Sequence, residues 1–525
     1  MEPIIWIAAL TFLLRALPRF LGVKLEGGDQ TAHLLMAREI RRNRFKLPVK
    51  IKGFLLPGIY DYPPLFHYLL AVFPDKSREQ IAPFVSAFID TVHVTVIYFF
   101  AIYLIQFSRL SPYLEDTTWV AAIAALLFAT SPALLYFGIG PRAFQATPRT
   151  LGELFITLTF FLGLVYYVEG SYLAFLLASF FAALSLLTSK FGGQVLIFFS
   201  IGLATLLMEP ELLLLPILGV GFALVLTKGH YWKVLIGWIK HSILYKTIMI
   251  KNYNTYIDRN TLVPFRGLAN AAKKLDARGF ALSLRDVLTN NSYIILLIRN
   301  PILSILLILS ILHAKAFADN GTFMFLGAWV VVSLLTFFIT SLRPFIFLGE
   351  AERYIEHSIP AQVILLSFLL FPLPSPSLLI GLLAYQILIY IPVIIWIYVV
   401  YKKGAPARKV KADLFNWLIA QGITGKRILS IPGDYNQIIY RTGNWVLLPP
   451  GNLTLIDKDK FESLWEVIPW PNRDIARLIA DYQLEYIIVL KSGLTYALER
   501  GWKYEIDCYH MIYENEHYAV YRAEA

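Results

Sequence analysis

Residues 151–227 read LGELFITLTFFLGLVYYVEGSYLAFLLASFFAALSLLTSKFGGQVLIFFSIGLATLLMEPELLLLPILGVGFALVLT, and this stretch decides the fold class. It contains four apolar segments, at 151–168, 171–188, 192–208 and 211–227. Each is about as long as a helix that crosses the hydrocarbon layer. Only short turn sequences separate the members of each pair, and their Gly and Pro residues favour tight turns. The stretch therefore predicts two helical hairpins in a membrane.

Apolar segments of the same kind recur on both sides of this stretch. They lie at 3–22, 82–107, 118–137, 292–312, 322–341, 358–374 and 376–400, which makes eleven predicted spans. Of the 525 residues 57% are hydrophobic and only 16% are charged, against about 25% charged in a soluble protein. The first segment lacks a basic start and a small-residue cleavage site, so we expect a retained helix. The chain is predicted to be a polytopic α-helical membrane protein.

Eleven spans place the two chain ends on opposite sides of the membrane. They also divide the connections: one side receives the long or polar ones, at 23–81, 138–150, 189–191, 228–291, 342–357 and beyond 401. The first of these contains the basic cluster Arg38, Arg41, Arg42, Arg44 and Lys46. The positive-inside rule would make this side cytoplasmic, whereas the functional interpretation below makes it extracytoplasmic.

The composition changes after the last span. Residues 402–525 begin with a basic linker and continue as alternating helix-like and strand-like runs, DLFNWLIAQG, RILSIPG, NRDIARLIADYQL, EYIIVLKS and EHYAVYRAE. This alternation predicts a small soluble α/β domain after a membrane module at 1–401. We also expect the polar residues of that module to lie at helix ends, which disfavours a transporter with polar groups at the bilayer midplane.

Charge and cysteine content exclude some classes of partner and site. The net charge is +11, but the basic residues lie between apolar spans, which fits anionic lipid or a phosphorylated lipid substrate better than nucleic acid. Cys508 is the single cysteine, so the chain cannot form an internal disulfide or a multi-cysteine metal site.

Candidate catalytic residues begin directly after the first span, in GGDQTAHLLMAREIRR. Asp29 and His33 are four apart, so a helix that begins here places both on one face. Asp29 could be a catalytic carboxylate or only the N-cap of that helix. About thirty residues later Tyr62-Pro63-Pro64 predicts a rigid extended segment before the next helix.

These two motifs resemble the first luminal loop of the GT-C glycosyltransferases, multispan enzymes that use polyprenyl-phosphate sugars and include protein O-mannosyltransferases and aminoarabinose transferases. The resemblance implies that Asp29 is the catalytic base or binds the acceptor, with His33, Arg38 and Tyr62 as substrate-binding candidates. Many members have Asp-Glu where this chain has Asp29-Gln30, so one carboxylate is missing. The Trp-Trp-Asp signature of oligosaccharyltransferases is absent, which argues against that branch.

Three further motifs extend the resemblance. GIGPRAFQATPRTLGELF supplies Arg149 and Glu153, the latter matching an acidic residue that family members often have near this helix start. Thr188-Ser189-Lys190-Phe191 resembles a short basic loop of the family. Arg353-Tyr354, followed by His357, resembles an element whose arginine contacts the lipid phosphate.

The chemistry of such a reaction needs these residue types. A phosphate leaving group gathers negative charge in the transition state, and Lys190, Arg353 and Arg149 could stabilise it. An acceptor hydroxyl needs a base, for which Asp29 and Glu153 are the catalytic candidates. Each cation has an alternative role, because Lys190 could extend toward the interface and Arg353 could pair with a neighbouring glutamate.

A metal and the long basic loop are left open by the sequence. His33, His67 and His357 lack the close spacing of a metal site, and neutral hydrogen-bonded histidines are the favoured interpretation. No cofactor is certain, although the superfamily includes metal-dependent members, so a divalent metal is possible. The loop 228–291 alternates apolar and basic residues as interfacial helices do, and could guide a polyprenyl tail or shield the bundle.

The sequence thus predicts an inverting glycosyltransferase of the GT-C type, a multi-pass protein of the cell membrane with its active site and C-terminal domain extracytoplasmic. It would move a hexosyl or pentosyl group from a polyprenyl-phosphate donor to a glycan, lipid or protein acceptor. The alternatives are a transporter or flippase of lipids or oligosaccharides, and a non-catalytic membrane partner of a glycan-assembly complex.

Overall fold

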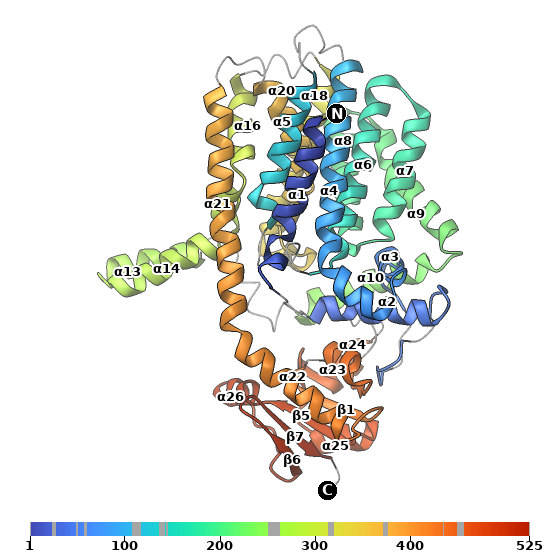
Figure 1. Cartoon of the computed structure of the whole chain (residues 1–525), viewed down its shortest axis with the longest axis vertical. Coiled ribbons are helices and arrows are strands. Elements are labelled where there is room, and N and C mark those ends of the chain that lie inside the picture. The colour runs from blue at the N-terminus through green and yellow to red at the C-terminus, as the bar shows by residue number, and fades with distance from the viewer. Residues whose placement is uncertain are drawn as a thin grey trace. The chain divides into compact units, whose positions relative to one another are not determined.

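The computed structural model describes residues 2–23, 28–48, 51–56, 60–107, 117–135, 142, 145–249, 263–312, 320–370, 376–433, 435–448 and 456–523. These residues form two compact units (Figure 1). Unit 1 comprises residues 1–23, 81–231 and 254–398, and unit 2 comprises 24–80, 232–253 and 399–525. Several connections predicted from the sequence, including 108–117, 313–321 and the Pro-rich 372–375, lie wholly or mostly outside the described residues.

Unit 1 is a bundle of apolar helices. Seven helices are long and apolar enough to cross a membrane, among the described residues: α1 (Glu2–Phe20), α4 (Asp75–Phe107), α5 with a 3-10 turn (Thr117–Leu135), α6 (Pro148–Glu169), α8 (Lys190–Leu207), α18 (Gly321–Ser341) and α21 (Pro376–Lys403). Three shorter apolar helices accompany them: α7 (Tyr172–Leu186), the pair η3 and α9 (Pro210–Leu226), and α20 (Ile359–Leu370). With the bent pair described next, an apolar helix lies at each of the eleven predicted spans.

The predicted span 292–312 is broken. It consists of α15 (Ser292–Arg299) and α16 (Pro301–Leu312), which meet at an angle of 78°. Pro301 cannot donate a backbone hydrogen bond and cannot continue the preceding helix. The Asn300 side chain accepts a hydrogen bond from the Leu303 backbone N–H at 3.2 Å and donates to Gln362 Oε1 at 2.9 Å. The sequence is apolar on both sides of the break, so hydropathy alone predicted one continuous span.

The predicted hairpins are present. In the first, Gly170 ends α6 with φ of 68° and Ser171 caps α7 by accepting a hydrogen bond from the Ala174 N–H. A residue other than glycine rarely adopts that φ. The packing of α7 onto α9 is close, because a Cβ at Gly219 of α9 would lie 3.0 Å from Ala182 Cβ of α7.

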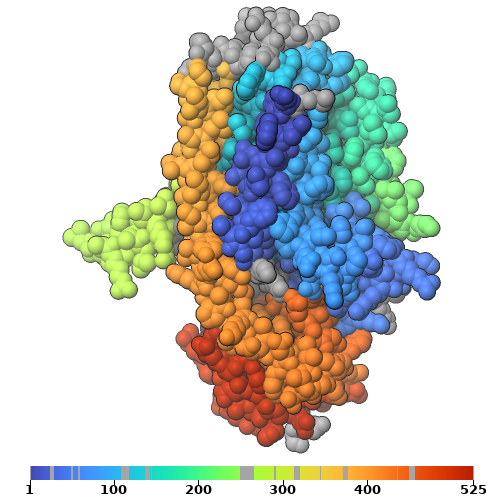
Figure 2. Space-filling model, viewed as in Figure 1, coloured from blue at the N-terminus to red at the C-terminus, as the bar shows by residue number. Residues whose placement is uncertain are grey.

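The shorter helices of unit 1 lie in the connections. They are α13 (Val263–Lys273), α14 (Ala277–Asn290), the 3-10 helix η5 (Arg343–Leu348) and α19 (Glu352–Glu356). In Figures 1 and 2 the hairpin α13–α14 projects sideways from the bundle.

Unit 2 contains the C-terminal mixed α/β fold. Its five-stranded sheet has the order β2-β1-β5-β7-β6. Strands β2, β1 and β5 are parallel, β7 is antiparallel to β5, and β6 is antiparallel to β7. The strands are β1 (Arg427–Ile431), β2 (Trp445–Val446), β5 (Tyr486–Leu490), β6 (His510–Glu514) and β7 (Tyr518–Arg522), and β3 (Trp465–Val467) pairs with β4 (Trp470–Pro471). The helices are α22 (Ala405–Ala420), α23 (Tyr435–Thr442), α24 (Lys458–Leu464), α25 (Ile475–Tyr482) and α26 (Lys491–Glu499). All five predicted runs have the predicted type; the strands β2, β3, β4 and β6 and the helices α23, α24 and α26 were not predicted.

The loop after α1 folds with this sheet. It forms α2 (Gly28–Arg42) and α3 (Leu65–Ala71), and between them residues 53–55 pair with β2 through hydrogen bonds of 2.8 and 2.9 Å. Gly53 has φ of +95°, and a Cβ there would lie 2.3 Å from Ile439 Cγ2. Leu56, together with Leu244 of α10 (Tyr231–Leu244) and Ile248 of the following π-helical turn η4 (Tyr245–Met249), packs in the same core as Leu429 and Ile487. Residues 402–525 therefore share their core with parts of both long loops.

Candidate functional site

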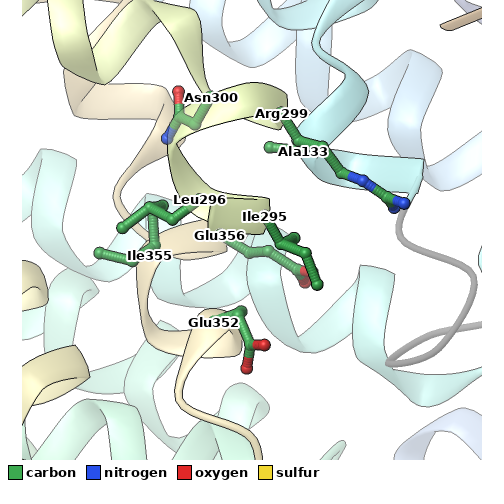
Figure 3. A pocket seen from close by; sticks show the side chains of 8 residues that line it. All are labelled: Ala133, Ile295, Leu296, Arg299, Asn300, Glu352, Ile355 and Glu356. Atoms are coloured by element: carbon green, nitrogen blue, oxygen red, sulfur yellow. The ribbon is translucent and has the colours of Figure 1, made fainter. Parts of the chain in front are cut away.

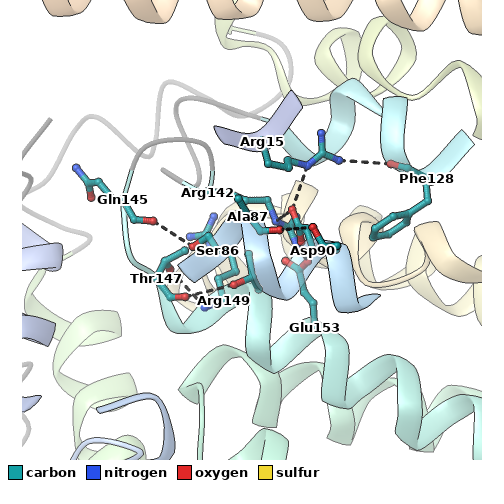
Figure 4. A network of polar contacts seen from close by, with 12 residues as sticks. Arg15, Ser86, Ala87, Asp90, Phe128, Arg142, Gln145, Thr147, Arg149 and Glu153 are labelled. Carbon is teal, nitrogen blue, oxygen red and sulfur yellow. Dashed lines mark hydrogen bonds and ion pairs between the residues drawn. The ribbon is translucent and has the colours of Figure 1, made fainter. Parts of the chain in front are cut away.

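A buried charge network crosses unit 1 (Figure 4). The Asp90 carboxylate accepts from Arg15 Nε at 3.0 Å and lies 3.1 Å from Arg142 Nε. Arg142 also donates through Nη2 to the Glu153 carboxylate. All four side chains are buried. Two cations and two carboxylates give the group no net charge, which is the condition under which buried charges are tolerated.

This network corrects the expectation that polar residues lie only at helix ends. Asp90 lies near the middle of α4, and His93, one turn later, has its Nε2 2.9 Å from Thr157 Oγ1 of α6. Arg15 of α1 also donates to Tyr390 Oη and to the Phe128 carbonyl. A carboxylate within a long apolar run is the sequence signal that would have identified Asp90.

The start of α6 places a second cation near this network. Thr147 caps the helix, its hydroxyl accepting from the Arg149 N–H at 3.3 Å, and Pro148 occupies the first turn. Pro is favoured at this position because its missing N–H would have no partner there. The Arg149 side chain is partly buried, and its Nη1 has no hydrogen-bond partner among the described residues.

The segment 350–357 brings further charges to the same region. Arg353 pairs with Glu350 at 2.9 Å, as the alternative interpretation of this arginine expected. Burial raises the pKa of Glu356 to about 8; Glu153 adds to this effect, and Arg149, Arg142 and Arg353 oppose it.

Burial lowers the pKa of His357 to about 3, and the same three arginines contribute. Its imidazole is therefore neutral, and its Nδ1 has no hydrogen-bond partner among the described residues. A neutral imidazole that lacks a partner at one nitrogen can donate to or accept from a bound molecule.

Phe191 joins the Lys190 loop to this segment. Its ring stacks on His357 and lies 4.8 Å from the Tyr354 ring, centroid to centroid, and the Arg353 guanidinium lies 5.1 Å from its centre. Tyr354 is fully buried and donates to Gln194 Oε1 of α8 at 3.2 Å. Lys190 is the first residue of α8, after the Ser189 cap. Glu153, Arg149, Lys190, Arg353, Tyr354 and His357 thus belong to one region of unit 1.

A pocket opens beside this region at the break between α15 and α16 (Figure 3). It is lined by Glu352, Glu356, Arg299, Asn300 and four apolar residues. Its volume is about 20 Å³, room for about one water molecule. A sugar-phosphate would require it to widen.

Unit 2 holds the other predicted site residues. His33 Nδ1 lies 2.9 Å from His67 Nε2, and His67 Nδ1 is hydrogen-bonded to the Tyr60 hydroxyl. The Tyr62 ring packs against both imidazoles. Burial lowers the pKa of His33 to about 4 and that of His67 well below its usual value, so both rings are neutral. Both histidines are hydrogen-bonded, as the favoured interpretation of them expected.

Asp29 and Arg38 lie on the same helix, α2. Asp29 is exposed in its first turn, where the helix dipole stabilises a carboxylate, and it raises the pKa of His33 against the effect of burial. The Arg38 guanidinium lies 4.9 Å from the centre of the Tyr440 ring, donates to the Tyr440 carbonyl at 3.2 Å and lies 3.9 Å from Glu39.

The described residues contain no group of three or more His, Cys, Asp or Glu side chains placed to hold a metal ion. His33 and His67 are adjacent to each other, whereas His357 belongs to unit 1.

Comparison with known proteins places this architecture. No protein-family model and no curated protein matches the chain, but solved structures do. ArnT from Cupriavidus metallidurans in the apo state superposes with a TM-score of 0.57 at 12% identity, over 99% of this chain and 98% of ArnT. The apo oligosaccharyltransferase of Archaeoglobus fulgidus gives 0.56 at 12% identity, over 97% of this chain and 72% of that one.

The chain has the GT-C fold. A second ArnT structure, bound to undecaprenyl phosphate, gives a TM-score of 0.54. The archaeal oligosaccharyltransferase AglB, solved with an inhibitory peptide and a dolichol-phosphate, gives 0.52. At 12% identity these likenesses establish the fold, and they confirm the polytopic helical membrane architecture expected from the sequence.

Proposed function

We propose that this chain is a GT-C glycosyltransferase that transfers a sugar from a polyprenyl-phosphate donor to an acceptor on the extracytoplasmic side of the membrane. The observation that carries the proposal is the Arg149 guanidinium, partly buried and grouped with Arg353 and Arg142 around Glu356. The GT-C fold supports it, because solved structures of that fold include ArnT with undecaprenyl phosphate.

The proposed reaction is a single displacement. The acceptor oxygen forms a bond to the anomeric carbon on the face opposite the phosphate, the carbon–oxygen bond to phosphate breaks, and the configuration inverts. Arg149, Arg353 and Lys190 stabilise the charge that develops on the leaving phosphate, with Tyr354 and His357 beside them. Arg142 is less suited to this role, since Asp90 and Glu153 already neutralise it.

A base must accept the acceptor proton. Asp29 is the first candidate because its carboxylate is exposed, and His33, Arg38 and Tyr62 belong to the same unit, where they would position the substrate. Glu153 is the second candidate. Its carboxylate is buried and paired with Arg142, so it is less free to reach an acceptor proton.

Binding of undecaprenyl phosphate to the purified protein tests the donor site. Replacing Arg149 or Arg353 by alanine removes a charge-assisted hydrogen bond, which is expected to weaken binding about tenfold or more. Lys190→Ala should act in the same direction. Arg477→Ala, at an exposed position on α25, is the matched control and should bind like the wild type. Unchanged affinity in all three variants would place the phosphate elsewhere.

Transfer itself separates the proposal from its rivals. A glycosyltransferase incubated with a polyprenyl-phosphate sugar and an acceptor must release polyprenyl phosphate in proportion to glycosylated product. A flippase would move the intact lipid without releasing it. A non-catalytic partner would do neither, and would tolerate loss of Asp29.

A further inference from the structure

The hairpin α13–α14 combines two amphipathic helices with a basic composition. Residues 263–290 contain five basic residues and two acidic ones. On α14 the apolar residues Phe280, Leu284, Val287 and Leu288 recur at the i, i+4, i+7, i+8 spacing of one helix face. Arg278 and Arg285 are seven apart, on another face.

The first helix of the hairpin has the same design. Phe265, Leu268 and Ala272 recur at i, i+3 and i+7, and Arg266 and Lys273 are seven apart on another face. Each helix therefore presents one apolar face and one basic face.

The apolar faces are only partly covered by contact between the two helices. Ala271 and Val287 are buried, and a Cβ at Gly267 would lie 3.3 Å from Ser283 Oγ. In contrast, Phe280, Leu284 and Leu288 are 39%, 38% and 46% exposed.

The tip of the hairpin is more unusual. Leu275 is 93% exposed and has φ of 53°, in the left-handed region that a bulky residue rarely adopts. The turn is fixed at this position because the next residue, Asp276, caps α14 by accepting a hydrogen bond from the Gly279 N–H at 2.9 Å. A large apolar side chain held in a strained turn, fully open to solvent, has no role within the folded chain that its contacts show.

Two observations identify what covers this surface. The hairpin carries five exposed basic residues outside its apolar faces, Arg266, Lys273, Lys274, Arg278 and Arg285. The hairpin also continues directly into the bent apolar pair, because Asn291 ends α14 and caps α15, the first half of that pair. A basic amphipathic segment beside a membrane span lies at the bilayer surface, where its cations contact anionic headgroups.

We propose that α13–α14 is a lipid-binding paddle that docks on the anionic surface of the bilayer, with Leu275, Phe280 and Leu284 inserted among the acyl chains. The proposal commits to the bilayer as the occupant and not to a polyprenyl tail or a protein. It does not depend on the glycosyltransferase function.

The single native cysteine makes a direct test possible. Leu275→Cys in a Cys508→Ser background accepts one environment-sensitive fluorophore at the tip, and the full-length protein is then reconstituted into liposomes. The unaltered protein labelled at Cys508, which is exposed, is the control. Lipid-borne nitroxide quenchers should quench the tip label and leave the Cys508 label unquenched, while aqueous iodide should do the reverse.

Lipid charge provides the second arm. Quenching of the tip label should rise when a zwitterionic bilayer is enriched in phosphatidylglycerol, and it should fall again in the variant Arg278→Gln/Arg285→Gln. Each charge removed is expected to lower the equilibrium constant for docking of the hairpin on the bilayer surface roughly fivefold. Both substitutions lie at exposed positions, so the fold should not change.

Two results would overturn the proposal. One is a tip label that iodide quenches as strongly as the Cys508 label in every bilayer. The other is a tip label that enters an apolar environment only after undecaprenyl phosphate or an acceptor is added, which would assign the hairpin to the substrate.

Discussion

Asp90 and Asp29 differ in burial and in ion-pair partners, and this difference indicates which of the two carboxylates is structural and which can react. Asp90 is fully buried and lies within 3.1 Å of two guanidinium nitrogens, so it is neutralised and held in place. Asp29 is exposed on the first turn of α2. A general base must be able to reach a substrate proton, and Asp29 has that freedom where Asp90 does not.

Asp29→Asn should therefore abolish most transfer without unfolding the protein. The amide keeps the shape but cannot take a proton, and the loss of a positioned base costs roughly 10²–10⁴ in rate. Removing the charge from the first turn of α2 should cost only about 0.3–1 kcal/mol in stability. Initial rates of sugar transfer and the thermal unfolding midpoint, measured on the same preparation, separate the two effects. A well-folded variant with near wild-type rates would mean that Asp29 only stabilises α2 through the helix dipole.

The His33–His67 pair predicts a pH dependence of stability. Burial holds the pKa of His33 at about 4, against about 6.5 when unfolded. Between these values the unfolded chain binds a proton that the folded chain does not, so stability falls as pH falls. Thermal unfolding in detergent between pH 7 and pH 4 should show the decline, and His33→Asn should flatten it. A slope unchanged by this substitution would mean that other groups control it.

At the scale of elements, the charge network fixes how α1, α4 and the start of α6 pack. Arg15 comes from α1, Asp90 from α4 and Glu153 from α6, while Arg142 precedes α6. Ridges of apolar side chains leave several helix arrangements with similar burial. A buried ionic group is satisfied in only one of them. We interpret the network as selecting that arrangement.

Asp90→Leu should accordingly be far more harmful than its apolar surroundings suggest. It leaves Arg15 and Arg142 buried with a single remaining carboxylate, and breaking a buried ion pair costs about 3–5 kcal/mol. The double variant Asp90→Leu/Arg15→Leu restores neutrality and should recover part of that loss. The unfolding midpoints of both variants, with Leu498→Ala at an exposed site of α26 as control, measure the difference. Equal destabilisation by the single and double variants would contradict the coupling.

The elements also show what sequence reasoning could reach. Hydropathy located all the apolar helices, because the requirement for about 20 apolar residues is strong and local. It missed the break at Asn300-Pro301, because hydropathy is summed over the apolar run and does not register a single proline, although that proline is the local signal for a break. The pairing of residues 53–55 with β2 was equally out of reach, since contacts between distant segments leave no periodic signal.

The candidate site was also predictable only in part, because local motifs can be read from the sequence and contacts between distant segments cannot. Motifs at 149–153, 188–191 and 353–357 were identified singly, and the fold joins them through Phe191 and the charges around Glu356. Asp90 and Arg15 were missed because no motif surrounds them. Their only signal was a charge inside an apolar run. We did not use that signal, because we expected polar groups to lie at helix ends.

For the whole molecule, the number of spans determines which side of the membrane each chain end faces. Within the part of the chain that the structure describes, seven helices qualify as spans by length and composition, eight with the bent pair, and three shorter apolar helices remain. If all eleven cross, the chain ends lie on opposite sides, and if only eight cross they lie on the same side. We expect eleven, because α7, α9 and α20 pack in the same bundle as the longer helices.

An N-terminal epitope tag and the native Cys508 test this count in intact cells. Cys508 is exposed and is the only cysteine, so a membrane-impermeant maleimide reports its side without mutagenesis. With eleven spans and an extracytoplasmic C-terminal domain, Cys508 should react in intact cells and the tag should be detected only after permeabilisation. If neither end is accessible in intact cells, an even number of helices crosses and both ends are cytoplasmic. In that case the donor could not be an extracytoplasmic polyprenyl-phosphate sugar approached from the side of Cys508, and the proposed side of the reaction would fail.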